Sequence, residues 1–137
     1  MLRVQPAQLT NPQQMTVTVA GPDGANTMYI MDGQVNYAVG AGNAVPVTQT
    51  YSILLGPVLT RKQFVQAIGT ASIAGLNFSN AANSQFNAWV NITNTDADWD
   101  DESGQVELRV EFTVTPPQSG GATLMTLGYH VTALAQM

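Results

Sequence analysis

The sequence contains no cysteine, and only 9% of its residues are charged. The lack of cysteine excludes disulfides and thiolate metal sites, and it leaves the redox compartment undetermined. Globular domains usually carry about a quarter charged residues, so this surface must be built mainly from Thr, Asn, Gln, Ser, Ala and Gly. A neutral surface of that kind loses its water easily, which favours contact with other proteins or with sugars.

Basic residues are especially scarce. Arg3, Arg61, Lys62 and Arg109 are the four in the chain, and the net charge is −5. Four cations neutralise few phosphates, so direct binding of nucleic acid is not expected. No apolar run approaches the ~20 residues that a membrane-spanning helix needs, so no membrane span is expected either.

Catalytic side chains are also few. The chain has one histidine, His130, and no Gly-x-Ser-x-Gly motif. A strand histidine without a neighbouring nucleophile is typical of a structural contact rather than of a catalytic group. Paired-carboxylate hydrolysis would need a cleft, which a hairpin tip does not provide. The sequence therefore predicts a protein that is not an enzyme.

Period-two alternation of apolar and polar residues dominates what is present. The 137 residues suit one domain. The alternating segments predict an all-β fold, an antiparallel β-sandwich or flattened barrel of about seven or eight strands. Residues 1–14, rich in Gln, Pro and Asn, are expected to form an extended N-terminal arm, and residues 15–137 the single β-sandwich domain.

Two local signals interrupt the alternation in the first half of the chain. Asp32-Gly33 is a strong signal for a two-residue hairpin turn. Thr60 and Gln63 have the spacing of a capping box, and the apolar residues after them fit one helical stripe. We therefore expect one short helix at about residues 60–68, with a connecting loop or a strand as the alternative.

The last third of the chain predicts a three-stranded meander over residues 85–93, 105–115 and 122–135. With the bends placed in the acidic segment and in residues 116–121, Ile92 lies opposite Val106, and Leu108 opposite Tyr129. The apolar faces of all three strands then coincide. A slip of one residue would turn the core side of a strand to water, which favours this register.

The outward face of this meander is a candidate binding surface. The predicted register places Trp89 beside Arg109 and Gly128, with Asn87 and Asn91 in the neighbouring rows. It also places His130 opposite Glu107, as a cross-strand contact. A flat sheet with one aromatic ring and flanking polar groups suits a sugar ring or another subunit. The alternative is that the rest of the domain covers this face.

Five of the seven residues from Asp96 to Glu102 are carboxylates. Asp96, Asp98 and Asp100 have the spacing of calcium-binding loops, and with Glu102 they are the candidate metal ligands. Asp101 stands where such loops require glycine, and no helices are expected to flank the segment. The alternative is a solvated or partner-facing loop, because runs of charge are usually exposed.

Trp99 lies in the middle of these carboxylates. A tryptophan buries a large area, so the ring is expected either to fold back as a lid over the end of the sandwich or to insert into a partner as an anchor. Both interpretations make Trp99 a candidate interface residue.

These features predict a non-enzymatic structural subunit of a larger assembly, such as a virus or phage particle, a tail or a surface filament. Its partners would be further copies of itself or other structural subunits, in a virion or extracellular assembly. The N-terminus lacks the apolar stretch of a secretory signal, so either a signal was removed before residue 1 or the protein is kept inside. The alternative is a carbohydrate- or ligand-binding module, without cofactor or dependent on calcium.

Overall fold

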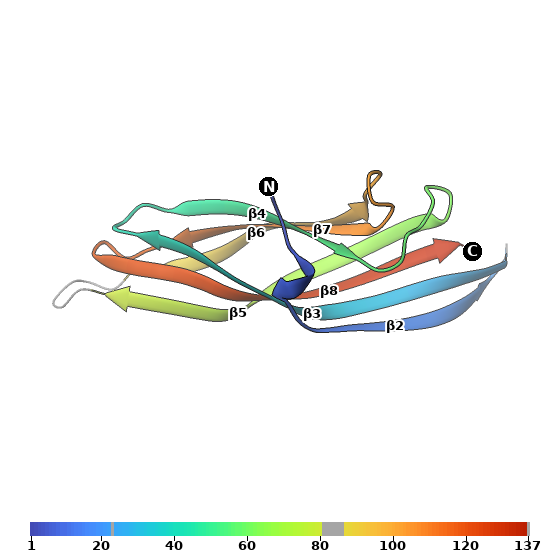
Figure 1. The fold of residues 1–137 in the computed structure, drawn as a ribbon, viewed down its shortest axis with the longest axis horizontal. Coiled ribbons are helices and arrows are strands. Elements are labelled where there is room, and N and C mark those ends of the chain that lie inside the picture. The colour runs from blue at the N-terminus through green and yellow to red at the C-terminus, as the bar shows by residue number, and fades with distance from the viewer. Residues whose placement is uncertain (23, 81–86, 137) are drawn as a thin grey trace.

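The structure is a computed structural model that describes residues 1–22, 24–80 and 87–136. It confirms the predicted all-β sandwich, in which two four-stranded sheets pack on each other (Figure 1). The first sheet has the strand order β1-β4-β7-β6, and the second sheet has the order β2-β3-β8-β5. The elements are β1 (Leu2–Arg3), the 3-10 turn η1 (Pro6–Gln8), β2 (Leu9–Gly21), β3 (Gly24–Gly42), β4 (Val47–Leu55), β5 (Phe64–Asn80), β6 (Trp89–Trp99), β7 (Val106–Thr115) and β8 (Gly120–Gln136).

The core lies between the two sheets. Alternate residues of the central strands β7 and β8 are fully buried, as the period-two pattern predicts. The Phe112 ring stacks on the Tyr51 ring, with centroids 5.7 Å apart and planes 9° apart. Burial of each large side chain stabilises the fold by about 1.5–3 kcal/mol. The largest fully buried apolar side chains are Phe112, Leu108, Leu124, Val35, Val106, Val110, Val114 and Val131.

The predicted meander is wrong in its pairing. β6 does pair with β7, but Ile92 lies opposite Phe112, and Val106 lies opposite Trp99 instead of Ile92. β6 therefore continues to Trp99, and the first acidic residues belong to a strand. Alternation fixes which side of a strand faces the core, but every even shift of the register buries the same side. Residues 85 and 86 of the predicted strand lie outside the described residues.

The expected pairing of β7 with β8 is also wrong. β7 lies between β4 and β6, whereas β8 lies between β3 and β5 in the other sheet. Leu108 is opposite Ile53 and Ala97 within the first sheet, and Tyr129 is opposite Gly33 within the second. The apolar faces of β7 and β8 meet across the core instead of side by side, so matched faces alone could not distinguish the two arrangements.

Asp32-Gly33 is not a turn. It lies in the middle of β3, a strand of 19 residues, in which Asp32 is opposite His130 on β8. The buried side of β3 continues from Tyr29 and Met31 past Gly33 to Val35, and the neighbouring strands β2 and β8 pair with β3 on both sides of this point. The hairpin bends earlier, where Gly21 pairs with Gly24.

The predicted helix at residues 60–68 is absent from the described residues, whose only helical element is η1. The capping-box contacts do form: the Thr60 N–H donates to Gln63 Oε1 (2.9 Å), and the Gln63 N–H donates to Thr60 Oγ1 (3.3 Å). They close a single turn, after which Phe64 begins β5. The residues that follow pair with β8 over the length of the sheet, and this pairing outweighs a weak local preference for helix.

Residues 1–14 connect the two sheets. Leu2 and Arg3 form β1, which adds to the edge of β4 as a parallel strand, with Leu2 opposite Tyr51. The Val4 N–H donates to the Ser52 carbonyl at 2.8 Å. The chain then turns through η1 and enters the second sheet as β2.

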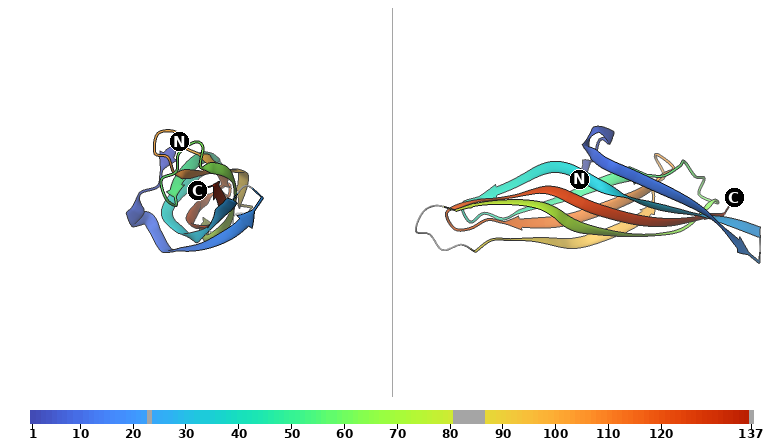
Figure 2. Two further views of the ribbon diagram at one scale, coloured as in Figure 1. Left: turned by 90° about the vertical axis from the view of Figure 1, so that its right-hand side faces the viewer. Right: turned by 90° about the horizontal axis from the view of Figure 1, so that it is seen from below.

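The β2–β3 hairpin projects beyond the rest of the sandwich (Figures 1 and 2). Its residues from Asn11 to Thr18 are exposed on both faces of the strand. Among the strands that the structure describes, none lies beside the outer long edge of β2.

Candidate functional site

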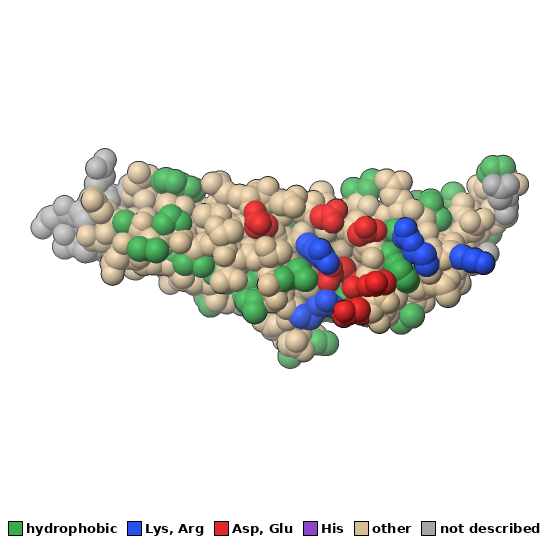
Figure 3. Space-filling view, turned by 90° about the horizontal axis from the view of Figure 1, so that it is seen from above, with side chains coloured by type: hydrophobic (Ala, Val, Ile, Leu, Met, Phe, Trp, Pro, Cys, Tyr) green, Lys and Arg blue, Asp and Glu red, His purple; other side chains and the backbone are tan. Residues whose placement is uncertain are grey.

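Charged side chains gather on the outer face of the first sheet (Figure 3). At the centre of the group is Glu107, whose side chain is only 5% exposed. Its two oxygens accept hydrogen bonds from Arg3 Nη2 at 2.8 Å and from Arg109 Nε at 2.5 Å. The contact with Arg3 fastens β1 to the sheet, and the carboxylate raises the pKa of Arg109. Glu107 therefore connects the start of the chain with the middle of β7.

The predicted calcium ligands are divided between a strand and a turn. Asp96 and Asp98 lie on β6, opposite Arg109 and Glu107. Asp100 accepts hydrogen bonds from the Ser103 hydroxyl (2.6 Å) and the Ser103 N–H (2.9 Å), which lower its pKa. These bonds stabilise the tight turn between β6 and β7, where Glu102 is exposed.

A protein cation already lies among these acids. Asp96, Asp98 and Asp100 line a depression of about 140 Å³ together with Glu107 and Arg109. The charges of Glu107, Asp96 and Asp100 all favour the cationic form of Arg109. Within residues 1–22, 24–80 and 87–136, no three metal-ligating side chains are placed so that they could hold one metal ion.

Trp99 contacts the segment that precedes β5. Its indole Nε1–H donates to the Leu59 carbonyl at 3.0 Å, and the Arg61 guanidinium lies 5.6 Å from the ring centroid. The ring is half-buried in this position. Trp99 thus connects the segment before β5 with the end of β6.

The other predicted interface residues do not form one cluster. Trp89 is opposite Thr115 and 46% exposed, whereas Arg109 lies further along β7 beside Glu107. Trp89 and Asn87 line a shallow pocket of about 310 Å³ with Pro116 and Gln118. Asn91 is exposed on β6 opposite Thr113, and Gly128 belongs to the second sheet.

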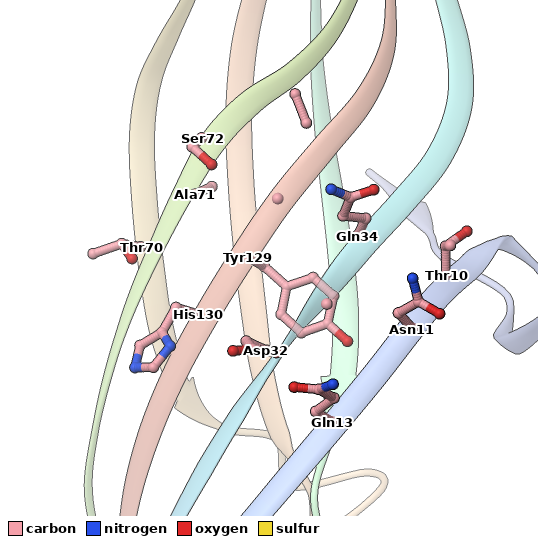
Figure 4. A pocket seen from close by; sticks show the side chains of 13 residues that line it. Thr10, Asn11, Gln13, Asp32, Gln34, Thr70, Ala71, Ser72, Tyr129 and His130 are labelled. Carbon is pink, nitrogen blue, oxygen red and sulfur yellow. The ribbon is translucent and has the colours of Figure 1, made fainter.

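A polar groove of about 470 Å³ crosses the outer face of the second sheet (Figure 4). Gly33 and Gly128 are among the residues that line it. A β-bulge between Thr10 and Gln13 separates β2 locally from β3. The polar side chains that line it are mainly hydroxyl and amide groups, with one carboxylate and one imidazole: Thr10, Asn11, Gln13, Asp32, Gln34, Thr70, Ser72, Tyr129 and His130.

Tyr129 extends across Gly33 into this groove. A Cβ placed on Gly33 would lie 2.6 Å from the Tyr129 hydroxyl oxygen, and the ring reaches over β3 towards Asn11 and Gln13 (Figure 4). Burial and the charge of Asp32 raise the pKa of the Tyr129 phenol. The absence of a side chain at Gly33 is therefore required for this ring position.

An apolar band adjoins the groove on the same face. In consecutive rows of the sheet, Met15 is opposite Ile30, and Val17 is opposite Met28. The row of Met15 and Ile30 continues through Thr132 on β8 to Ile68 on β5. The row of Val17 and Met28 continues to Leu134 on β8. The exposed fractions are 61% for Met15, 37% for Val17 and 64% for Ile68. We define the apolar band as Met15, Val17, Met28, Ile30, Ile68 and Leu134.

The chain matches no protein-family model, no curated protein and no solved structure. No helix in the part of the chain that the structure describes is long and apolar enough to cross a membrane.

The groove and the apolar band were both missed in the sequence. Their residues come from four strands, so their proximity depends on strand order rather than on spacing. One signal was present: Tyr29, Met31 and Val35 keep an apolar period of two on both sides of the supposed turn. An uninterrupted β3 would have placed Asp32 on the same face as Met28 and Ile30.

Proposed function

We propose that this protein is a non-enzymatic structural subunit of a larger protein assembly and acts through contacts between subunits. The observation that carries the proposal is the apolar band on the outer face of the second sheet. Six large apolar side chains lie in adjacent rows on a surface that faces solvent in the isolated chain. Contiguous exposed apolar surface of this kind marks interaction sites in monomeric domains.

The electrostatics of the second sheet support the same proposal. Its four strands contain one carboxylate, Asp32, one histidine, His130, and no lysine or arginine. Contact with a partner would therefore remove water from few charged groups on this sheet. Charged residues are generally rare at the centres of protein interfaces. The first sheet, by contrast, carries Arg3 and Arg109, both partly exposed to water, on either side of the buried Glu107 carboxylate.

The proposed context is a virus or phage particle, a tail or a surface filament, in which many weakly charged β-sandwich subunits repeat. The partners are other copies of this chain or other structural subunits. The proposed location is accordingly a virion or an extracellular assembly. Neither nucleic acid nor a metal ion is required for these contacts.

Light scattering over a range of protein concentrations tests the proposal. We expect an oligomer for the native chain, and a lower mass for the double variant Met15→Ser with Ile68→Ser, because both side chains lie in the apolar band. Val58→Ser is the matched control, since Val58 is 72% exposed but lies in the turn that precedes β5. A monodisperse monomer at all concentrations would contradict the proposal.

The polar groove supports a second candidate function, a carbohydrate- or ligand-binding module. Amide and hydroxyl side chains line the groove beside Gly128 and the phenol of Tyr129, which suits a neutral ligand with many hydroxyl groups. A glycan screen, performed with calcium and again with chelator, tests this function. Binding should be lost in Gln34→Ala and retained in Asn91→Ala. If no glycan binds either with calcium or with chelator, a carbohydrate-binding function is excluded.

A further inference from the structure

The unpaired long edge of β2 points to a specific way in which two copies of this chain join. Natural edge strands are usually protected by lysine, proline, a bulge or a covering segment. In the first sheet, β1 covers part of the β4 edge. The edges of β5 and β6 lie against each other, because a Cβ on Gly69 would come within 3.1 Å of the Ala97 Cβ. From Gln13 to Gly21, β2 has no charge, no proline and no bulge.

The hairpin register shows which residues face this edge. Gly21 and Gly24 are bridged although they are only three residues apart, so the two residues must exchange hydrogen bonds with each other. Alternation then directs the backbone groups of Val19, Val17 and Met15 towards β3. The alternate residues, Gln14, Thr16, Thr18 and Ala20, direct their N–H and C=O groups to the free edge.

We propose that a second copy of this chain pairs with β2 in antiparallel orientation, about a two-fold axis that passes by Val17. This inference rests on the proposed function and specifies its first contact. Thr16 would pair with Thr18 of the partner subunit, and Gln14 with Ala20 of the partner subunit. Each pair exchanges backbone hydrogen bonds, about eight in total over the contact. The two four-stranded second sheets would become one continuous sheet.

The positions of Pro12 and Pro22 favour this register over the two adjacent registers. An axis at Thr16 would place Pro12 opposite Ala20, and an axis at Thr18 would place Gln14 opposite Pro22. Proline has no N–H and cannot complete either pair. The axis at Val17 uses all four outward-facing residues, with both prolines outside the paired segment.

The side chains favour a second copy over a partner of different sequence. The paired segment has no charge, so it meets no like-charge repulsion when it pairs with itself. On the outer face, Val17 meets Val17 of the partner subunit, and Met15 meets Val19 of the partner subunit. The two apolar bands then become one surface that crosses the contact. On the inner face, threonine lies beside threonine, a favourable cross-strand pair.

A cysteine placed at the axis tests the register, because the chain has no cysteine of its own. In Val17→Cys the two thiols would belong to directly opposed residues with Cα atoms about 4.5 Å apart, which a disulfide spans. Val19→Cys is the matched control: the two copies of this residue would be four steps apart along the strands, about 13 Å. Under mild oxidation, Val17→Cys should form covalent dimer at about tenfold the yield of Val19→Cys or more.

A second substitution checks that the hydrogen bonds of the edge are responsible. Thr18→Pro removes an outward-facing N–H and leaves the bonds between β2 and β3 in place. Combined with Val17→Cys, it should abolish the covalent dimer while the circular dichroism spectrum and melting temperature stay close to those of Val17→Cys. Persistence of the cross-link at full yield in this variant would overturn the proposed pairing.

The remaining outcomes separate this inference from the proposed function. If the native chain is oligomeric and Val17→Cys does not cross-link, or cross-links no better than Val19→Cys, then β2 pairing is wrong while the assembly function stands. If the native chain is a monomer at all concentrations and Val17→Cys does not cross-link, both proposals fail.

Discussion

The two sheets share one core but have very different outer faces. The first sheet carries Glu107 between Arg3 and Arg109, with further carboxylates around them. The second sheet carries the apolar band and a polar groove with one carboxylate. Charges held in ion pairs and hydrated keep the first face in water, whereas the second face loses little hydration on contact. The two outer faces therefore differ in chemistry, although the alternation of apolar and polar residues is the same in both sheets.

The largest expected change in stability comes from a substitution in the core that the two sheets share. Phe112→Ala removes a fully buried ring from the shared core and should lower the free energy of unfolding by about 3–5 kcal/mol. Val65→Ala is the control: Val65 is 49% exposed on β5, so its change should stay within about 0.5 kcal/mol. Urea unfolding followed by tryptophan fluorescence and by circular dichroism measures both.

Both probes should shift together in Phe112→Ala, because fluorescence follows Trp89 and Trp99 of the first sheet and circular dichroism follows the strands of both. Two separate transitions would show that the sheets unfold independently, and the single shared core would then be refuted.

The next effect is confined to the second sheet. In Gly33→Ala the new methyl group would lie 2.6 Å from the Tyr129 hydroxyl oxygen and 2.9 Å from its ring carbon Cζ, so the ring must leave its place. We expect a loss of about 1–3 kcal/mol and a changed near-ultraviolet circular dichroism signal of tyrosine. In the matched control Gly40→Ala, on the same strand, the nearest atom is 3.5 Å away, and stability should hardly change. Equal losses would argue against the packing described for Tyr129.

A smaller effect is expected in the first sheet. Glu107→Gln keeps the shape of the side chain but removes its charge between Arg3 and Arg109. Because both arginines are partly exposed, the loss should be about 1 kcal/mol, and high salt should reduce the difference from the native chain. Glu111→Gln is the control, since Glu111 contacts the Thr93 hydroxyl and no arginine within the described residues.

Hydrogen exchange provides an independent measurement for Glu107→Gln. Loss of the Arg3 contact should loosen β1, so the Val4 amide, which donates to the Ser52 carbonyl, should exchange faster. Unchanged exchange at Val4 would mean that Glu107 does not hold β1 in place.

Much of the fold could be predicted from the sequence because alternation is a local property. Val106, Leu108, Val110, Phe112 and Val114 alternate with polar residues, and all five are buried in β7. The same pattern could not show which strands are neighbours. Pairing of β7 with β8 and packing of β7 over β8 bury the same residues, so the choice depends on the whole set of strands.

Local signals were reliable for local contacts only. Thr60 and Gln63 make the predicted reciprocal hydrogen bonds, yet no helix follows, because β5 gains a full-length neighbour in β8. Asp32-Gly33 has turn chemistry but lies where Gly33 is needed for a different reason, to make room for Tyr129. The groove could not be predicted, since its residues depend on both of these outcomes.

The smallest expected effect compares one tyrosine from each sheet. Burial raises the pKa of Tyr51 in the first sheet, and burial together with the charge of Asp32 raises that of Tyr129 in the second. Asp32→Asn should therefore lower the Tyr129 pKa part of the way to its ordinary value and leave Tyr51 unchanged. A phenol with a raised pKa stabilises the fold fully below its unfolded pKa of about 10, and this stability is lost as the pH rises through the folded pKa. Alkaline titration of tyrosinate absorbance, with Tyr129→Phe to assign the signal, measures the shift. If Asp32→Asn moves Tyr51 and Tyr129 equally, the charge of Asp32 acts on the whole molecule and not through the groove.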